Sequence, residues 1–313
     1  MEKEVLLDKA FKEAAKKAKA VKSSEKREKH IKADLSRLDI SSSIITSYLN
    51  SLIKAYKEIR KLDRFSKELL KTDVDYEKVK LEYRGVKASL RIIKRLTVNY
   101  RMRIKYSDDR RESNKLRKEF YGRLASVVKR LKYEELERFI KGRRKLPHIR
   151  KDVDTIIIAG APNVGKSLIL KQLSGSRVQV NEYPFTTKKI LIGYMRKGYE
   201  DIQLIDTPGL LDRPMEKRNK IEKKAILALK FLSKDVVFVI DYSESCGYSV
   251  EQQLKLLDEI KKLFKARVLL VATHRDLKHK KVKVDIEINA KDKKDIEKLK
   301  KQILLYFYGW DRN

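Results

Sequence analysis

The stretch that decides the fold is Val153 to Ser167, which reads VDTIIIAGAPNVGKS. Its first part, Val153 to Gly160, is apolar and β-branched, as expected of a buried strand. Its second part fits the spacing G-x-x-x-x-G-K-S, and a helical segment follows. A strand, a glycine-containing turn and a helix in this order predict the start of a βαβ unit.

The turn in this stretch is a candidate phosphate site. Glycines allow backbone N–H groups to point at an anion, and the N-terminus of the following helix adds a favourable dipole. We expect Lys166 to reach the β and γ phosphates of a nucleotide, and the Ser167 hydroxyl to ligate Mg²⁺. The residues predicted to contact the nucleotide here are Asn163, Val164, Gly165, Lys166, Ser167 and Leu168.

Two further segments complete the predicted phosphate site. Asp206 ends an apolar run and is followed by Thr207-Pro208-Gly209, the pattern D-x-x-G. We expect Asp206 to hold Mg²⁺ and the Gly209 N–H to sense the γ-phosphate. A threonine of the segment Tyr183-Pro184-Phe185-Thr186-Thr187 would complete the magnesium shell, with Thr187 the first choice and Thr186 the second.

Recognition of the base is predicted at Thr273-His274-Arg275-Asp276, after the fifth expected strand. Guanine-specific enzymes carry N-K-x-D there, and its carboxylate accepts two hydrogen bonds from guanine. Asp276 keeps that carboxylate, whereas Thr273 and His274 replace the Asn and the Lys. The loop Asn289-Ala290-Lys291 is expected to meet the guanine O6. The literal match that begins at Asn219 lies in a helical segment, so we interpret it as a structural feature.

The two halves of the chain differ in proline, glycine and charge. All five prolines lie from Pro147 onward, and residues 1–146 hold only three glycines, which predicts a bundle of long helices. Breaks between helices are expected near Ser41 to Ser43, Lys71 to Asp73 and Ser107 to Asp109. From Lys151 onward, six candidate strands alternate with helices, namely Val153–Gly160, Ile190–Tyr194, Ile202–Asp206, Val236–Asp241, Val268–Thr273 and Val282–Ile288.

The net charge of +33 points to a polyanionic partner. Residues 1–150 hold 44 basic and 22 acidic residues, an excess of 22 that is two thirds of the total. Within them, basic residues recur at helical spacing beside an apolar stripe, as suits an RNA phosphate backbone. A solvated, lysine-rich face is the alternative. The predicted RNA-binding residues are Arg84, Lys87, Arg91, Lys94, Arg95, Arg101 and Arg103.

Composition excludes several classes of protein. The longest apolar runs are far shorter than the ~20 residues that cross a bilayer, and the N-terminus lacks the apolar core of a signal peptide. One cysteine allows no internal disulfide, and four scattered histidines form no plausible zinc cluster. We therefore expect a cytoplasmic protein. A membrane-surface role would share the charge argument, but the basic residues are spread along helices instead of forming a terminal amphipathic anchor, so we expect no membrane partner.

With these motifs in place, the sequence closely resembles the Nog family of nucleolar-type GTP-binding proteins. Besides the phosphate loop, the segment Tyr183 to Lys188, the run Asp206 to Pro214 and the segment Asp241 to Gly247 carry the resemblance. It implies an N-terminal all-α bundle, residues 1–148, followed by a P-loop GTPase domain, residues 149–313, with a six-stranded, mainly parallel sheet flanked by helices. The chain ends at Asn313, and we expect an archaeal-type member without a long C-terminal extension.

The resemblance also implies a function. It predicts a GTPase that uses GTP, GDP and Mg²⁺ and assists large ribosomal subunit assembly, as a monomer that binds rRNA and the pre-ribosomal particle but no DNA. The residues expected to act in hydrolysis are Lys166, Thr187, Gly209 and Asn163.

Residue 210 bears on the rate of hydrolysis. Leu210 stands where Ras-like enzymes place a water-orienting glutamine, so we expect slow intrinsic turnover. Related enzymes use an asparagine at the position of Asn163 to help bind K⁺, which raises the hypothesis of potassium-stimulated hydrolysis. The alternative function is an RNA-binding assembly factor that nucleotide stabilises, with negligible turnover.

Overall fold

The computed structural model describes residues 2–22, 26–175, 178–182, 189–212, 214–274 and 282–309. They form two compact units, Met1–Leu62 with Val74–Lys141, and Asp63–Asp73 with Gly142–Asn313. We call these the helical unit and the α/β unit. A single boundary between residues 148 and 149 does not describe this division, because Phe65 and Leu69 are buried in the core of the α/β unit.

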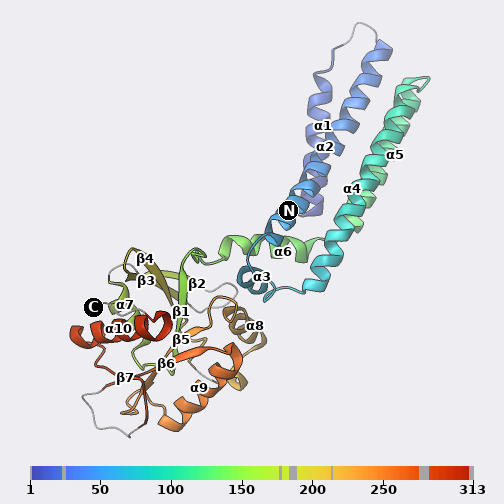
Figure 1. Cartoon of the computed structure of the whole chain (residues 1–313). Coiled ribbons are helices and arrows are strands. Elements are labelled where there is room, and N and C mark those ends of the chain that lie inside the picture. The colour runs from blue at the N-terminus through green and yellow to red at the C-terminus, as the bar shows by residue number, and fades with distance from the viewer. Residues whose placement is uncertain are drawn as a thin grey trace. The chain divides into compact units, whose positions relative to one another are not determined.

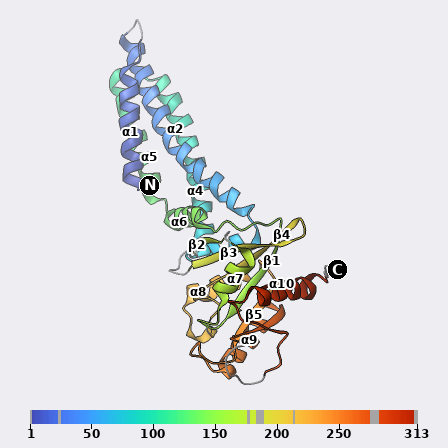
Figure 2. The same ribbon diagram turned by 90° about the vertical axis from the view of Figure 1, so that its left-hand side faces the viewer.

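The helical unit is built from long helices without proline. They are α1 (Lys3–Lys19), α2 (Lys26–Arg60), α4 (Tyr76–Lys105), α5 (Arg110–Arg130) and α6 (Glu134–Gly142). Helices α1, α2, α4 and α5 run side by side along the bundle (Figures 1 and 2). Among the described residues, no helix combines the length and the apolarity that crossing a bilayer requires.

The helices of the bundle meet along apolar stripes. Helix α4 carries buried residues at intervals of seven positions, namely Val79, Val86, Ile93 and Tyr100. This spacing returns a side chain to the same face of a helix, as in coiled coils. Helix α2 also has a buried apolar stripe, formed by Ile45, Leu49, Leu52, Tyr56 and Ile59.

One predicted helix break is wrong. Helix α2 runs through Ser41, Ser42 and Ser43 without interruption. The buried Ser41 hydroxyl donates to the carbonyl of Leu38 one turn back, and the Ser42 hydroxyl lies 2.6 Å from that of Thr97 on α4. These serines therefore stay inside the helix because its own backbone and a neighbouring helix satisfy their hydroxyls.

The other two predicted breaks are confirmed. Helix α3 (Arg64–Leu70) ends before Lys71, and the Asp75 side chain caps α4 by accepting from the amides of Glu77 and Lys78. Helix α4 ends at Lys105, and Asp109 caps α5 by accepting from the Glu112 amide. Aspartates at N-caps satisfy amides that have no partner in the first turn of a helix.

The α/β unit holds a seven-stranded sheet of order β2-β3-β4-β1-β5-β6-β7. Its strands are β1 (Asp154–Gly160), β2 (Gln179–Glu182), β3 (Lys189–Lys197), β4 (Glu200–Asp206), β5 (Asp235–Asp241), β6 (Arg267–Thr273) and β7 (Ile286–Glu287). The pairs β2/β3 and β3/β4 are antiparallel, and the others are parallel. The mainly parallel sheet is thus confirmed, with one strand, β2, more than the sequence predicts. The last strand is also shorter than predicted.

Helices cover both faces of this sheet. Helices α7 (Lys166–Ser174) and α10 (Lys293–Tyr308) pack on one face, and α8 (Lys220–Leu229) and α9 (Val250–Phe264) on the other (Figure 1). The side chains of β1 alternate accordingly, since Ile156 and Ile158 enter the first core and Ile157 and Ala159 the second. Burial on both faces explains why the strands appear in the sequence as continuous apolar runs.

Candidate nucleotide-binding site

The candidate site lies at the carboxyl ends of the parallel strands. Gly160, Asp206, Asp241 and Thr273 each end a strand, β1, β4, β5 and β6. The register pairs Ile158 with Asp206 and Asp241 with Thr273, so these ends are neighbours. In open α/β sheets, ligands bind outside the carboxyl ends of the strands.

The phosphate loop has the backbone that its sequence predicts. Gly160 has a φ of 142°, and a Cβ atom there would lie 2.2 Å from the Val239 carbonyl oxygen. Gly165, with φ of 95°, is the N-cap of α7, and Asn163 also adopts positive φ, at 62°. Glycine is therefore required at residue 160 by both space and conformation.

Three polar side chains meet next to this loop. Lys166 is 7% exposed and donates to the Ala161 carbonyl at 2.6 Å, and burial lowers its pKa. Ser167 donates to Asp206 Oδ2 at 2.6 Å. Asp206 is fully buried, and burial raises its pKa. Among the described atoms, its Oδ1 has no hydrogen-bond donor.

This pair of oxygens fits Mg²⁺. A hydroxyl and a carboxylate in contact at the end of a helix and a strand are the hard oxygen ligands that this ion prefers. The buried Asp206 Oδ1 without a donor is a costly feature in a protein that lacks a cation there. The predicted magnesium ligands Ser167 and Asp206 are therefore brought together.

The segment after β4 differs in part from the prediction. The Gly209 amide, expected to sense the γ-phosphate, donates to Asp212 Oδ2 at 2.8 Å. The buried Arg218 donates to the Gly209 carbonyl at 3.3 Å and lies 4.0 Å from Asp212. Leu210 is fully buried in the core beneath α8. Neither Asp212 nor Arg218 was predicted to be a site residue, although Asp212 lies in the run Asp206 to Pro214 that carries the family resemblance.

On the base side of the site, Thr273 binds the phosphate loop directly. Its hydroxyl lies 3.0 Å from the Val164 carbonyl, 3.3 Å from that of Ile240 and 3.3 Å from His274 Nδ1. His274 has a φ of 58°, and its Nδ1 also lies 3.1 Å from Asp241 Oδ1. The two residues that replace Asn and Lys in the guanine motif thus both have polar partners.

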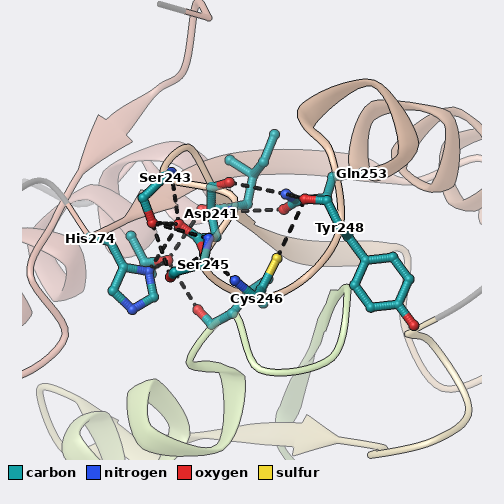
Figure 3. A network of polar contacts seen from close by, with 10 residues as sticks. Asp241, Ser243, Ser245, Cys246, Tyr248, Gln253 and His274 are labelled. Carbon is teal, nitrogen blue, oxygen red and sulfur yellow. Dashed lines mark hydrogen bonds and ion pairs between the residues drawn. The ribbon is translucent and has the colours of Figure 1, made fainter. Parts of the chain in front are cut away.

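Asp241 is the centre of a polar network that the sequence did not identify as part of the site (Figure 3). Its Oδ1 accepts from the amide and the hydroxyl of Ser243, and its Oδ2 from the Ser245 hydroxyl and the Cys246 amide. Burial raises the pKa of Asp241, but these hydrogen bonds outweigh it and hold the pKa below its usual range. Serines two and four residues after an aspartate are the signal that could have revealed the network.

Gln253 and Cys246 belong to the same network. The Gln253 side chain accepts from the Asp241 amide at 2.8 Å and donates to the Asp241 carbonyl at 3.0 Å. Cys246 is buried, and this burial raises the pKa of its thiol. It is a small structural residue, not an activated nucleophile.

The loop Asn289-Ala290-Lys291 follows β7, as predicted. The Asn289 amide donates to Asp295 on α10, and the Asn289 side chain accepts from the Lys291 amide. Asn219 is confirmed as structural, because it forms a capping box with Glu222 at the start of α8. Thr186, Thr187 and Asp276 lie outside the described residues.

The predicted RNA-binding residues all lie exposed on α4. Of the seven, Arg101 donates from one guanidinium nitrogen to both carboxylate oxygens of Asp39 on α2, and Arg103 lies 3.9 Å from Glu119 on α5. These two arginines therefore also form contacts between helices of the bundle. The full set is Arg84, Lys87, Arg91, Lys94, Arg95, Arg101 and Arg103.

Comparison with known proteins gives two family matches that together cover most of the chain. The model of the NOG1 N-terminal helical domain matches residues 1–154, and that of the 50S ribosome-binding GTPase matches residues 155–304. The uncharacterized protein MJ1408 of Methanocaldococcus jannaschii is 40% identical over 238 residues, which are 75% of this chain and 67% of that protein.

Relatives with functional names are also found. Nucleolar GTP-binding protein 1 of Drosophila melanogaster is 35% identical over 231 residues, 72% of this chain but 35% of that protein. This chain thus matches about a third of that relative's length. A crystal structure of nucleolar GTP-binding protein 1 from Plasmodium falciparum is 30% identical and covers 51% of this chain and 90% of that one, with a TM-score of 0.43.

Proposed function

Because the chain belongs to the Nog family of GTPases, we propose that it is a GTP-hydrolysing switch that assists large ribosomal subunit assembly in the cytoplasm. In this proposal the α/β unit binds GTP and GDP, and the helical unit binds precursor rRNA in the assembling particle. The observation that carries the proposal is the meeting of Lys166, Ser167 and Asp206 beside the amides of the phosphate loop.

Each group at the site has a chemical task in this proposal. Lys166 leaves the Ala161 carbonyl and contacts the phosphates, whose charge favours its protonated form. Ser167, Asp206 and Thr187 hold Mg²⁺, which when bound neutralises negative charge on the phosphates. The carboxylate of Asp276 accepts from guanine, with Thr273, His274 and the loop Asn289-Ala290-Lys291 around the base.

Slow intrinsic turnover follows from what surrounds the phosphate site. Leu210 is buried and cannot orient a water molecule. The Gly209 amide already donates to Asp212, so it must exchange this partner before it can bind a γ-phosphate. These same observations favour the alternative function, an RNA-binding assembly factor in which nucleotide is a structural ligand.

Single-turnover hydrolysis of GTP separates the two functions. We expect slow cleavage by the protein alone, faster cleavage with purified large-subunit particles, and none above background for Lys166→Ala in either case. Equal rates with and without particles, both at the level of Lys166→Ala, would leave only the structural role. Running the assay in sodium and in potassium buffers, with Asn163→Ala alongside, tests whether the exposed Asn163 helps to bind K⁺.

Binding of rRNA by α4 is tested by charge reversal. We expect the affinity for rRNA to fall steeply with added salt, because binding releases counterions from the phosphates. Changing Arg91, Lys94 and Arg95 to Glu should abolish most of this affinity. The matched control changes Lys9, Lys16 and Lys19 of α1 to Glu, since these are also exposed basic residues and the net charge changes equally. An equal effect of both triple variants would mean that α4 is no special RNA site.

A further inference from the structure

A groove with an apolar floor lies between α4 and α5 of the helical unit. Its volume is about 900 Å³. Its apolar lining, which we call the floor, consists of Leu81, Ala88 and Ile92 of α4, Val127 of α5, and Leu131, which directly follows α5. Two of these side chains face solvent to an unusual degree, since Leu81 is 67% and Ile92 is 46% exposed. They lie on the face of α4 opposite to Val79, Val86 and Ile93, which are buried in the bundle.

The rim of the groove is cationic. Arg84 and Arg91 line it from α4, and Arg130 and Lys132 from the end of α5 and the residues after it. Within the described parts of the chain, none of these four side chains has an acidic partner. The acidic residue of the lining, Glu82, has its carboxylate occupied, because it accepts from the Leu136 amide at 2.8 Å. The groove therefore combines aliphatic surface with unpaired positive charge.

A single-stranded nucleotide segment presents the complementary chemistry. An unstacked base offers an apolar face, and the phosphates on either side of it offer negative charge. A duplex hides its base faces, so it would use the rim and leave the floor empty. An acidic protein helix would also fit, but the excess of 22 positive charges over residues 1–150 favours a polyanion at long range.

We propose that this groove binds a single-stranded segment of rRNA, with unstacked bases on Leu81 and Ile92 and phosphates at Arg84, Arg91 and Arg130. The proposal rests on the proposed function in rRNA binding and names the form of RNA that the helical unit selects. It also explains why aliphatic residues of α4 are exposed here, since binding of phosphates by the arginines does not require them. The volume lies within the ~300–1,000 Å³ of sites that enclose small ligands, which suits a base but not a duplex.

The test compares two RNA probes with the full chain. Fluorescence anisotropy measures the affinity for an unstructured RNA of about 12 nucleotides, within the site sizes of single-strand binders, and for the duplex of the same sequence. The variant Leu81→Ala/Ile92→Ala removes the floor without changing charge. The control Val98→Ala/Met102→Ala truncates two residues of the same helix that are 64% and 50% exposed and do not line the groove.

We expect the floor variant to bind the single strand about five- to tenfold more weakly. This is the low end of the range for bases stacked on aromatic side chains, because Leu81 and Ile92 are aliphatic. Its affinity for the duplex and the slope of affinity against salt should stay unchanged, and the control should match the wild type. The variant Arg84→Gln/Arg91→Gln should instead lower the salt slope for the single strand by about 0.7 for each phosphate that the variant no longer neutralises.

Several results would overturn the proposal. One is a floor variant that binds the single strand as tightly as the wild type. A second is an equal loss of affinity for the single strand and for the duplex, which would mean that the floor residues only hold the basic side chains in place and do not contact bases. A third is unchanged RNA binding with lost binding to purified large subunits, which would indicate a protein helix as the occupant. Failure of the wild type to bind either RNA would instead refute rRNA binding itself, before any variant is compared.

Discussion

Replacing Asp241 by Asn is the most direct test of the polar network beside the phosphate loop. The buried carboxylate accepts four hydrogen bonds from Ser243, Ser245 and Cys246, and the His274 ring lies 3.1 Å away. Asn has the same shape, but one of its two terminal atoms is a donor. If its oxygen faces Ser243, its NH₂ group faces the Cys246 amide, and two donors meet.

The expected cost follows from this count. Leaving the buried Cys246 amide without an acceptor costs about 1–3 kcal/mol, and hydrogen bonds to a neutral oxygen are weaker by about 1 kcal/mol than those to a carboxylate. Removing a buried charge returns part of this loss. We expect the free energy of unfolding to fall by about 2–3 kcal/mol at pH 7. The control Ser245→Ala, which removes one hydroxyl, should cost about 1 kcal/mol.

The dependence on pH gives a second, independent readout. The pKa of Asp241 in the folded protein lies below that of the unfolded chain, which is about 3.9. Its contribution is therefore complete above about pH 5 and is lost as the pH falls through the folded-state pKa. Asn does not titrate, so the difference between wild type and variant should shrink on acidification.

Urea unfolding followed by circular dichroism at a series of pH values measures both effects. A loss below about 0.5 kcal/mol at pH 7, within the range of ordinary surface substitutions, would refute the reasoning. So would a difference that stays constant as the pH is lowered.

Three further predictions, involving four substitutions, follow from the same physics. Gly160→Ala should destabilise the protein by more than about 3 kcal/mol, because the new Cβ would lie 2.2 Å from a carbonyl oxygen and the residue has a φ of 142°. Gly122→Ala should instead stabilise the protein by about 0.5–1 kcal/mol, because this residue lies in the middle of α5 with open space around it. Thermal unfolding of the two variants measures both effects. Asp206→Asn should abolish the gain in GDP affinity that Mg²⁺ gives, as measured by titration calorimetry. It should not lower the stability of the nucleotide-free protein at pH 7, because burial raises the pKa of Asp206 and makes its ionised form costly. A loss of stability would contradict this reasoning. Asp34→Ala should cost about 3–5 kcal/mol in urea unfolding, since it leaves two arginines and the buried Ser113 without their shared carboxylate; a cost near that of an exposed residue would show that the cluster adds nothing.

The local rules of sequence predicted most of the α/β unit because its elements obey them. Strands buried on both faces appear as apolar runs, and the phosphate loop requires glycines at fixed positions, so β1, α7 and the contact of Ser167 with Asp206 could be anticipated. Strand β2 could not, because its four residues, Gln179–Glu182, form an edge strand of the sheet and contain no apolar run. Its position depends on pairing with β3, which is a tertiary property.

The error in α2 has a similar cause. Three consecutive serines are typical of a helix boundary when only neighbouring residues are considered, since their hydroxyls compete for the backbone. Ser42 instead finds Thr97, 55 residues further along the chain, and Ser41 is buried where water cannot compete. A contact of this range cannot be inferred from the local pattern.

The two residues that depart from the guanine motif, Thr273 and His274, both make polar contacts for which Asn and Lys are not needed. Thr273 is shorter than Asn, yet its hydroxyl reaches the Val164 carbonyl of the phosphate loop and lies close to the Ile240 carbonyl of β5. His274 lies within hydrogen-bond distance of Asp241, whose carboxylate also orders the loop from Ser243 to Cys246. The end of β6 is therefore joined to the phosphate loop and to the end of β5 by polar contacts of the Thr273 and His274 side chains. A movement of the end of β6 must therefore break contacts with both the phosphate loop and the end of β5. For this reason a change at Asp241 should alter nucleotide affinity as well as stability, although Asp241 lies outside the residues that would touch the nucleotide.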